Sequence, residues 1–185
     1  MLTHPIARAV LLFLAFIAGG VLLFVFDAYE VGSARFNSLL LITMTLIKLG
    51  YFITSLLRWI RRSGQEEVYR RHLLLFLLLS VLLIICSYAI DYYCLQRIYP
   101  DSFHLPFGAE DLVGQLLTFF YLSAGRFTTA GGSEVYATAS LAQAYVVSEI
   151  LLAYFTTVLI IANVGLLQTL LSPARRDEPT PPPAP

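Results

Sequence analysis

The sequence predicts an all-α membrane protein with four transmembrane helices, and two observations support this fold class. Hydrophobic residues make up 58% of the chain, which exceeds the roughly 45–50% that is usual in soluble domains. They fall in four long blocks, at residues 7–26, 39–60, 73–95 and 141–171. A helix needs about 20 mostly apolar residues to cross a bilayer, and each block is long enough. The pattern therefore favours one membrane domain over a soluble enzyme.

The charged side chains are sorted along the chain, although the formal net charge is zero. Arginines gather before the first block, between the second and third, and after the fourth: Arg8, Arg58, Arg61, Arg62, Arg70, Arg71, Arg175 and Arg176. The positive-inside rule predicts that both termini and the middle loop are cytoplasmic in a multi-pass cell-membrane protein. The opposite side then holds mostly carboxylates: Asp27, Glu30, Asp101, Glu110, Asp111 and Glu134. An acidic outer surface would concentrate cations.

The first two blocks leave alternatives open. Arg8 precedes an apolar core, as in a signal peptide, but the apolar run continues to Phe26 and exceeds the short core of about 7–15 residues that such peptides have. We therefore expect a retained helix. Lys48 lies near the middle of the second block and is a functional candidate by its position. Alternatively, it snorkels or pairs with Asp91 of the third block. Residues 61–71 either bind anionic lipid headgroups or form an ordinary loop.

An amphiphilic run of about 15 residues begins at Glu110, a length typical of re-entrant or interfacial segments. Pro106 and Gly108 break the chain before it, and Glu110 and Asp111 are expected in the first helical turn, where carboxylates are favourable. The C-terminal, partly negative end of this helix would then point into the membrane. The following residues 128–133 are rich in glycine and hydroxyl groups. Irregular backbone at membrane depth is tolerated where it lines a water-filled cavity, and this run suits such a lining.

Residues 121–136 read YLSAGRFTTAGGSEVY. This stretch resembles the pore segment of the tetrameric potassium-channel family, which runs aromatic-x-Ser, four residues, then Thr-Thr-Val-Gly-Tyr-Gly-Asp-x-Tyr. The resemblance implies a homotetramer in which four filters meet on an axis and their carbonyls replace an ion's hydration shell. It covers about half of the chain and defines a pore module at 71–172. The residues before it, 1–70, are expected to form two helices and a basic loop, and the proline-rich composition of 173–185 predicts a disordered tail.

The resemblance also implies roles for individual residues. The selectivity filter would consist of Thr128, Thr129, Ala130, Gly131, Gly132 and Ser133. A permeant monovalent cation, K⁺ or Na⁺, would bind at Thr129, Ala130 and Gly131. Glu134 would form a carboxylate ring at the outer mouth, or brace the filter from behind. The fourth block is similar to the inner helix of bacterial potassium channels. Its polar residues, Thr156, Thr157 and Asn163, would line the cavity or form hydrogen bonds between helices.

This chain departs from the family pattern at the filter. Ala130, Gly132 and Ser133 stand where the family has Val, Tyr and Gly. These changes remove packing, add backbone freedom and place a non-glycine residue at a position that favours positive φ. We therefore expect weak discrimination between K⁺ and Na⁺, or no conduction. Arg126 replaces a small hydroxyl residue. It either pairs with Glu149 or Glu134 and braces the filter, or faces the axis and repels cations.

The leading functional hypothesis is a passive cation channel with an altered filter. The alternative is a pore-like protein that does not conduct and serves as a scaffold or regulatory subunit. An enzyme is not expected, because no nucleophile–base pair, metal cluster or phosphate loop is recognisable. Cys86 and Cys94 are too few for a disulfide framework. Apart from the permeant ion and the lipid bilayer, the sequence suggests no cofactor, nucleic acid or small-molecule substrate.

Overall fold

The computed structural model describes residues 33–63, 73–105, 111–130 and 134–163, together with residues 11, 14, 15, 18–20 and 22. The elements are helix α2 at Ala34–Ser63, helix α4 at Leu73–Ile98, strand β1 at Phe103–His104, helix α5 at Leu112–Phe127, strand β2 at Tyr136–Ala137 and helix α6 at Ser140–Ala162. Most of the predicted first span, the end of the predicted fourth span and the tail at 173–185 lie outside the described residues.

Three helices in the described part of the chain are long and apolar enough to cross a membrane: Ala34–Ser63, Leu75–Ile98 and Ser140–Ala162. By length and composition, the chain is therefore a multi-pass helical membrane protein, as the second to fourth blocks predict. Helices α2 and α4 extend past their apolar blocks because local signals set their ends. The Ser33 hydroxyl accepts a hydrogen bond from the Phe36 amide at 3.3 Å and caps α2. Pro100 disfavours helical backbone at Tyr99, just beyond the end of α4.

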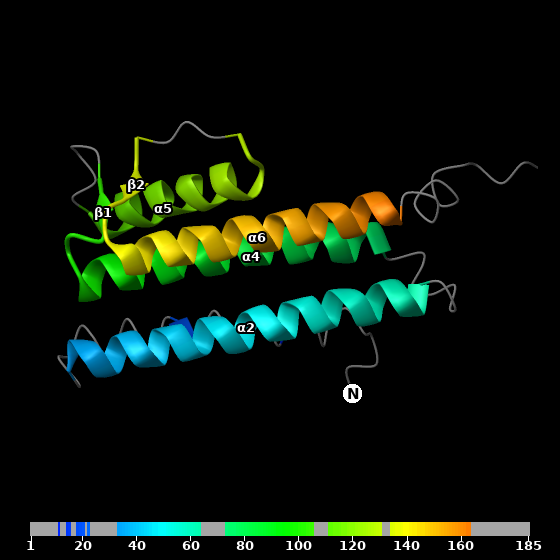
Figure 1. Cartoon of the computed structure of the whole chain (residues 1–185), viewed down its shortest axis with the longest axis horizontal. Coiled ribbons are helices and arrows are strands. Elements are labelled where there is room, and N and C mark those ends of the chain that lie inside the picture. The colour runs from blue at the N-terminus through cyan, green and yellow to red at the C-terminus, as the bar shows by residue number, and fades with distance from the viewer. Residues whose placement is uncertain are drawn as a thin grey trace, which may run out of the picture.

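The helices form three layers (Figure 1). Helices α4 and α6 run antiparallel side by side in the middle layer. Helix α2 covers one face of this layer through contacts with α4, and α5 covers the other through contacts with both α4 and α6. The arrangement gives α4 a contact with every other described helix.

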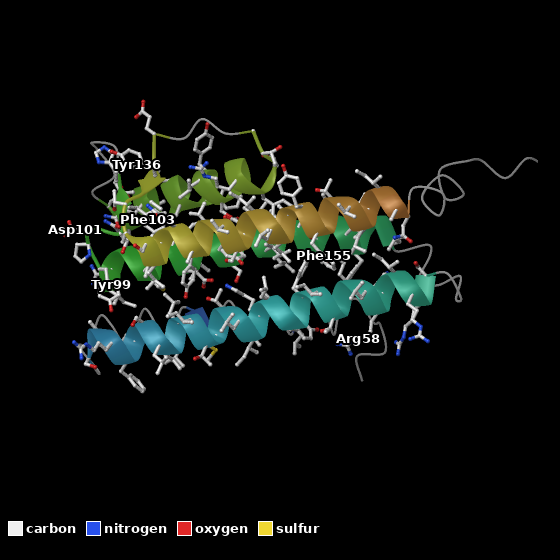
Figure 2. All side chains as sticks on the ribbon, in the orientation of Figure 1. Arg58, Tyr99, Asp101, Phe103, Tyr136 and Phe155 are labelled. Carbon is white, nitrogen blue, oxygen red and sulfur yellow. The ribbon has the colours of Figure 1, made fainter. Side chains whose placement is uncertain are left out.

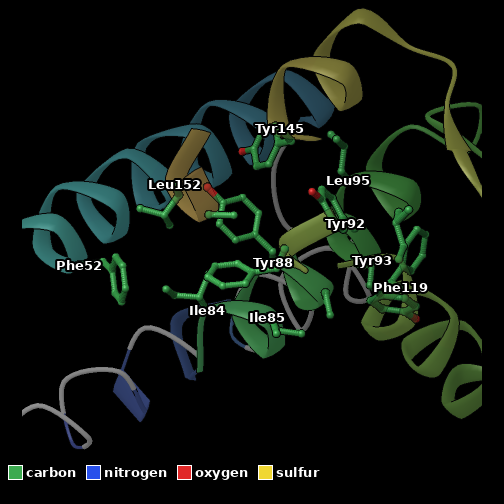
Figure 3. Close-up of a cluster of buried hydrophobic side chains, with 14 of the residues drawn as sticks. Phe52, Ile84, Ile85, Tyr88, Tyr92, Tyr93, Leu95, Phe119, Tyr145 and Leu152 are labelled. Atoms are coloured by element: carbon green, nitrogen blue, oxygen red, sulfur yellow. The ribbon is translucent and has the colours of Figure 1, made fainter. Parts of the chain in front are cut away.

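Aromatic side chains fill the core at two places. Near β1, the Phe103 ring contacts the rings of Tyr92 and Phe119 edge-on, with centroid distances of 5.2 Å in both cases. This cluster joins the β1 segment to α4 and α5, and Figure 3 shows Tyr92 and Phe119 among the buried side chains. On the other face, Trp59 of α2 stacks on Phe76 of α4 at 4.1 Å. The two clusters attach α5 and α2 to opposite sides of α4.

Exposed charged residues of opposite sign gather toward opposite ends of the bundle. Figure 2 shows Asp101 and Tyr136 at the end where β1 and β2 lie, and Arg58 toward the other end. Arg61 and Arg62 follow Arg58 in the last turn of α2. This arrangement agrees with the charge sorting in the sequence, in which the acidic end also holds Arg35 and Arg97.

One described residue of the first block packs closely on α4. The Cys94 thiol donates a hydrogen bond to the Gly20 carbonyl at 3.6 Å. A Cβ atom at Gly20 would lie 2.9 Å from Cγ2 of Ile90, so a larger residue there would force this contact apart. Glycine at this position therefore permits a close approach of the two segments.

Candidate functional site

The segment between α4 and α6 leaves one end of the bundle and returns to the same end. Strand β1 precedes α5 and β2 follows it, and the two pair antiparallel with Phe103 opposite Ala137. The Thr138 amide adds a bond to the Ser102 carbonyl at 2.9 Å. Helix α5 has 16 residues, a length of about 24 Å. It is therefore shorter than the bilayer's hydrocarbon core of about 30 Å.

The short helix agrees with the expected run from Glu110, but it begins two residues later. Asp111 occupies the N-cap position and makes no side-chain capping bond, and the first turn contains no acidic residue. The expectation that Asp111 lies within the first turn is therefore wrong, and Glu110 lies outside the described residues. Asp111 still lies beside the positive end of the helix, where a carboxylate is favourable.

The residues after α5 begin an irregular, exposed segment. Thr128 caps the helix, with its amide donating to the Ala124 carbonyl at 2.9 Å. Thr129 has a φ of 57°, the one positive value among the described non-glycine residues. A β-branched residue in this left-handed region carries strain of order 1–3 kcal/mol. Thr128, Thr129 and Ala130 are exposed. The other three expected filter residues, Gly131, Gly132 and Ser133, lie outside the described residues.

Glu149 lies inside the bundle and joins three helices. None of its surface is exposed. One carboxylate oxygen accepts a hydrogen bond from the Tyr92 hydroxyl of α4 at 2.5 Å, and the other accepts from the Ser123 hydroxyl of α5. Ser123 also lies 3.0 Å from the Ile85 carbonyl of α4. Because Glu149 belongs to α6, these bonds connect α5 to the two helices that it covers.

Arg126 lies in the last turn of α5, where a cation is favourable beside the negative helix end. Among the described residues of this single chain, no ion pair joins Arg126 to Glu149 or Glu134. Both oxygens of Glu149 are bonded by Tyr92 and Ser123 instead. Glu134 is exposed near β2. The bracing or axial role of Arg126 in an assembly stays a prediction.

The three polar residues expected to line a cavity differ in their surroundings. Thr156 is buried within the chain, with 1% of its surface exposed, and its hydroxyl donates to the Leu152 carbonyl at 2.8 Å. Thr157 is exposed, and Asn163 is partly exposed, with its amide donating to the Leu159 carbonyl at 2.8 Å. The surface that α6 offers to a neighbour therefore includes Thr157 and Asn163 but not Thr156.

Lys48 of α2 pairs with Asp91 of α4 inside the bundle, which confirms the pairing alternative for this lysine. Only 8% of Lys48 and 5% of Asp91 is exposed. The Lys48 nitrogen also lies 5.1 Å from the centre of the Tyr88 ring, a cation–π distance. Figure 3 shows Tyr88 in the same interior cluster as Tyr92 and Tyr145. The buried charge is therefore compensated by a carboxylate and an aromatic face.

The sequence reasoning missed the hydroxyl groups that complete this interior. Tyr88 and Ser148 lie 3.0 Å apart across α4 and α6, and the Thr45 hydroxyl of α2 lies 3.4 Å from that of Tyr145. A signal was present in the third block, since Tyr88, Asp91 and Tyr92 are three and four residues apart and share one helix face. The tyrosine hydroxyl groups are not apparent from the composition of the block, because tyrosine counts as an apolar residue there.

Within the described residues, no three His, Cys, Asp or Glu side chains are grouped so that they could hold a metal ion. Comparison with known proteins finds no matching family model, no matching curated protein and no matching solved structure. The described residues show a helical, multi-pass membrane protein with a short returning segment and two buried carboxylates, Asp91 and Glu149, that both accept hydrogen bonds.

Proposed function

We propose that the chain is one subunit of a homotetrameric, potassium-channel-like cation pore with weakened K⁺ selectivity. The observation that carries the proposal is the segment between α4 and α6. It consists of a helix too short to span, followed by the filter-like residues, and it returns to the strand pairing from which it started. A re-entrant pore segment needs this course, because the filter must lie within the membrane while both its ends attach at one surface.

In this proposal, residues 71–172 form the pore module. The negative end of α5 directs its field toward the permeant cation, and backbone carbonyls from Thr129, Ala130 and Gly131 replace water around it. The left-handed backbone of Thr129 supports this reading, since strained residues gather at functional sites. Thr157 and Asn163 line the cavity below the filter, and Glu134 contributes a carboxylate ring at the mouth.

The buried contacts of Glu149 support the same arrangement. A filter that has lost the tyrosine brace needs its helix held by other means. The bond from Ser123 to Glu149 attaches α5 to α6 one turn before α5 ends, and the bond from Tyr92 joins the same carboxylate to α4. These bonds hold α5, but they do not replace the missing tyrosine brace at residues 128–133. The absence of this brace favours a loose filter.

The charge distribution sets the proposed orientation. The end with Arg58, Arg61 and Arg62 is cytoplasmic and contacts anionic headgroups, and the end with Asp101, Asp111 and Glu134 faces outward. A negative outer surface raises the local cation concentration, an effect that weakens as salt screens it.

The decisive experiment is ion flux through the purified chain in liposomes, with K⁺, Na⁺ and Cl⁻ gradients imposed in turn. Cation flux that ranks K⁺ only slightly above Na⁺ is the expected result. Anion flux would instead indicate that Arg126 faces the axis. No flux under any gradient from a confirmed tetramer would contradict a constitutive pore and favour the scaffold alternative.

Restoring the family residues in the filter tests whether a loose filter weakens K⁺ selectivity. The triple variant Ala130→Val, Gly132→Tyr, Ser133→Gly restores packing and a glycine, and it should shift the reversal potential toward that of K⁺. The single variant Ser140→Gly, at the start of α6 and outside the filter, serves as a control. An unchanged reversal potential in a conducting triple variant would refute the explanation by loosening.

The role of Arg126 is tested by Arg126→Thr, which places a small hydroxyl residue at this position. If Arg126 pairs with a carboxylate of a neighbouring subunit, the variant should weaken the tetramer on native gels. Intact assembly together with a larger cation current would show that Arg126 obstructs the axis instead.

A further inference from the structure

The Lys48–Asp91 pair is well placed geometrically. Helices α2 and α4 are antiparallel (Figure 1), and the side chains of a helix lean toward its own N-terminus. Lys48 therefore leans toward the end of the bundle where α2 begins, while Asp91 leans away from that end. Because Asp91 lies nearer that end in its helix, the two side chains converge.

Thr45 of α2 connects this pair to α6. The Thr45 hydroxyl lies 3.1 Å from Oδ2 of Asp91 and 3.4 Å from the Tyr145 hydroxyl. Helix α2 thus contacts α4 through a charge pair and reaches α6 through one threonine. Tyr145 in turn lies four residues, or one helical turn, before Glu149, which bonds Ser123 of α5. A short series of contacts therefore leads from Lys48 to the helix that precedes the filter-like residues.

The seam beside the pair is not fully packed. A small cavity lies between α2, α4 and α6, and it is lined by Lys48, Leu49, Phe52, Ile84, Ser87, Tyr88 and Leu152. Both the Lys48 side chain and the Tyr88 ring border it, so the charge pair lies beside a gap in the packing. A buried charge pair contributes little net stability, since well-packed apolar residues in its place often give an equally stable or more stable protein.

We propose that Lys48 and Asp91 form a latch through which α2 holds α6 in the arrangement seen here. When the pair opens, α2 releases Asp91 and the contact between Thr45 and Tyr145 is lost. Helix α6 then shifts at Tyr145, one turn from the residue that holds α5. Helix α2 thus controls the position of α6 and, through it, of α5. Only the effect on conduction rests on the proposed function.

The test uses the full-length chain and two variants that affect different parts of the latch. Lys48→Met with Asp91→Leu removes both charges together, so no unpaired charge is left to prevent folding. Tyr145→Phe keeps the charge pair and removes only the contact with Thr45. The matched controls are Thr43→Val on the exposed side of α2 and Tyr154→Phe on the exposed side of α6.

Two readouts separate the latch from conduction. The first is the distance between spin labels at Leu57 of α2 and Val158 of α6, both exposed, with Cys86 and Cys94 replaced by alanine and labelled chains diluted in unlabelled ones. The second is cation flux in liposomes. In both latch variants we expect a shifted distance distribution and a flux change of roughly fivefold or more, the lower range of typical allosteric coupling. The controls should match the unmodified chain.

The outcomes distinguish the two proposals. A shifted distance without flux in any protein, the unmodified chain included, would support the latch and contradict the channel. Unchanged distances in both latch variants, whether or not the chain conducts, would overturn the latch and leave the pair a structural contact only.

Discussion

The two faces of the α4–α6 layer hold their covering helices in different ways. On one face, α5 is attached by hydroxyl groups that donate to Glu149 and by the aromatic cluster around Phe103. On the other face, α2 is attached near its middle by the ion pair of Lys48 with Asp91, with a cavity beside it. Each face buries a carboxylate, which a lysine pairs on the α2 face and hydroxyl groups bond on the α5 face.

Hydroxyl bonds and charge pairs differ in how much stability is lost when one partner is removed. Short hydroxyl bonds to a buried carboxylate fix geometry, and each removed partner costs about as much as a strong hydrogen bond. A buried charge pair contributes little net stability when intact and is very unfavourable when half of it is removed. The α5 face is therefore built for rigidity, and the α2 face is suited to a change between two states.

The largest effect is expected from breaking the charge pair on one side only. Lys48→Met leaves the Asp91 carboxylate in the interior without its cation. This variant should reduce the free energy of unfolding by about 3–5 kcal/mol. Thermal unfolding in detergent measures this. The double variant with Asp91→Leu should recover most of the loss. If the single and double variants are equally unstable, the contrast between the two faces is lost.

Glu149 is expected to give the second largest effect. Glu149→Ala leaves the buried hydroxyls of Tyr92 and Ser123 without their acceptor and should cost about 3 kcal/mol. Glu149→Gln retains one acceptor oxygen and should cost less. Gln143→Ala, exposed on the same helix, is the control and should change the unfolding temperature little. Equal effects of all three variants would mean that Glu149 does not hold α5.

The smallest effect is expected at Thr129. Glycine adopts positive φ without steric strain, so Thr129→Gly should stabilise the chain by up to about 1 kcal/mol. Thr128→Gly is the matched control. Thr128 has a φ of −85°, and glycine there should destabilise through added freedom in the unfolded chain. Destabilisation by Thr129→Gly would show that the threonine hydroxyl, which donates to the Thr128 carbonyl at 2.7 Å, outweighs the strain.

The sequence by itself determined the membrane class of this protein and the positions of its described spanning helices. Long apolar blocks leave the backbone no alternative to helix in a bilayer, so block length alone predicts them. The short run after Glu110 was likewise predicted as a helix too short to span. Its start was misplaced because Asp111 occupies the N-cap position, with extended backbone, rather than the first turn, and where a helix starts depends on backbone geometry at single residues.

Only the tertiary structure decided which polar side chains meet inside the bundle. Glu149 was one of two carboxylates that the sequence offered as partners of Arg126, and within the described residues of this chain its oxygens accept from Tyr92 and Ser123. The pairing of Lys48 with Asp91 was one of two open alternatives until the helices were placed side by side. The physical reason is that helical periodicity shows which residues share a face of one helix. Which face meets which neighbour depends on crossing, tilt and depth, and these follow from packing over the whole molecule.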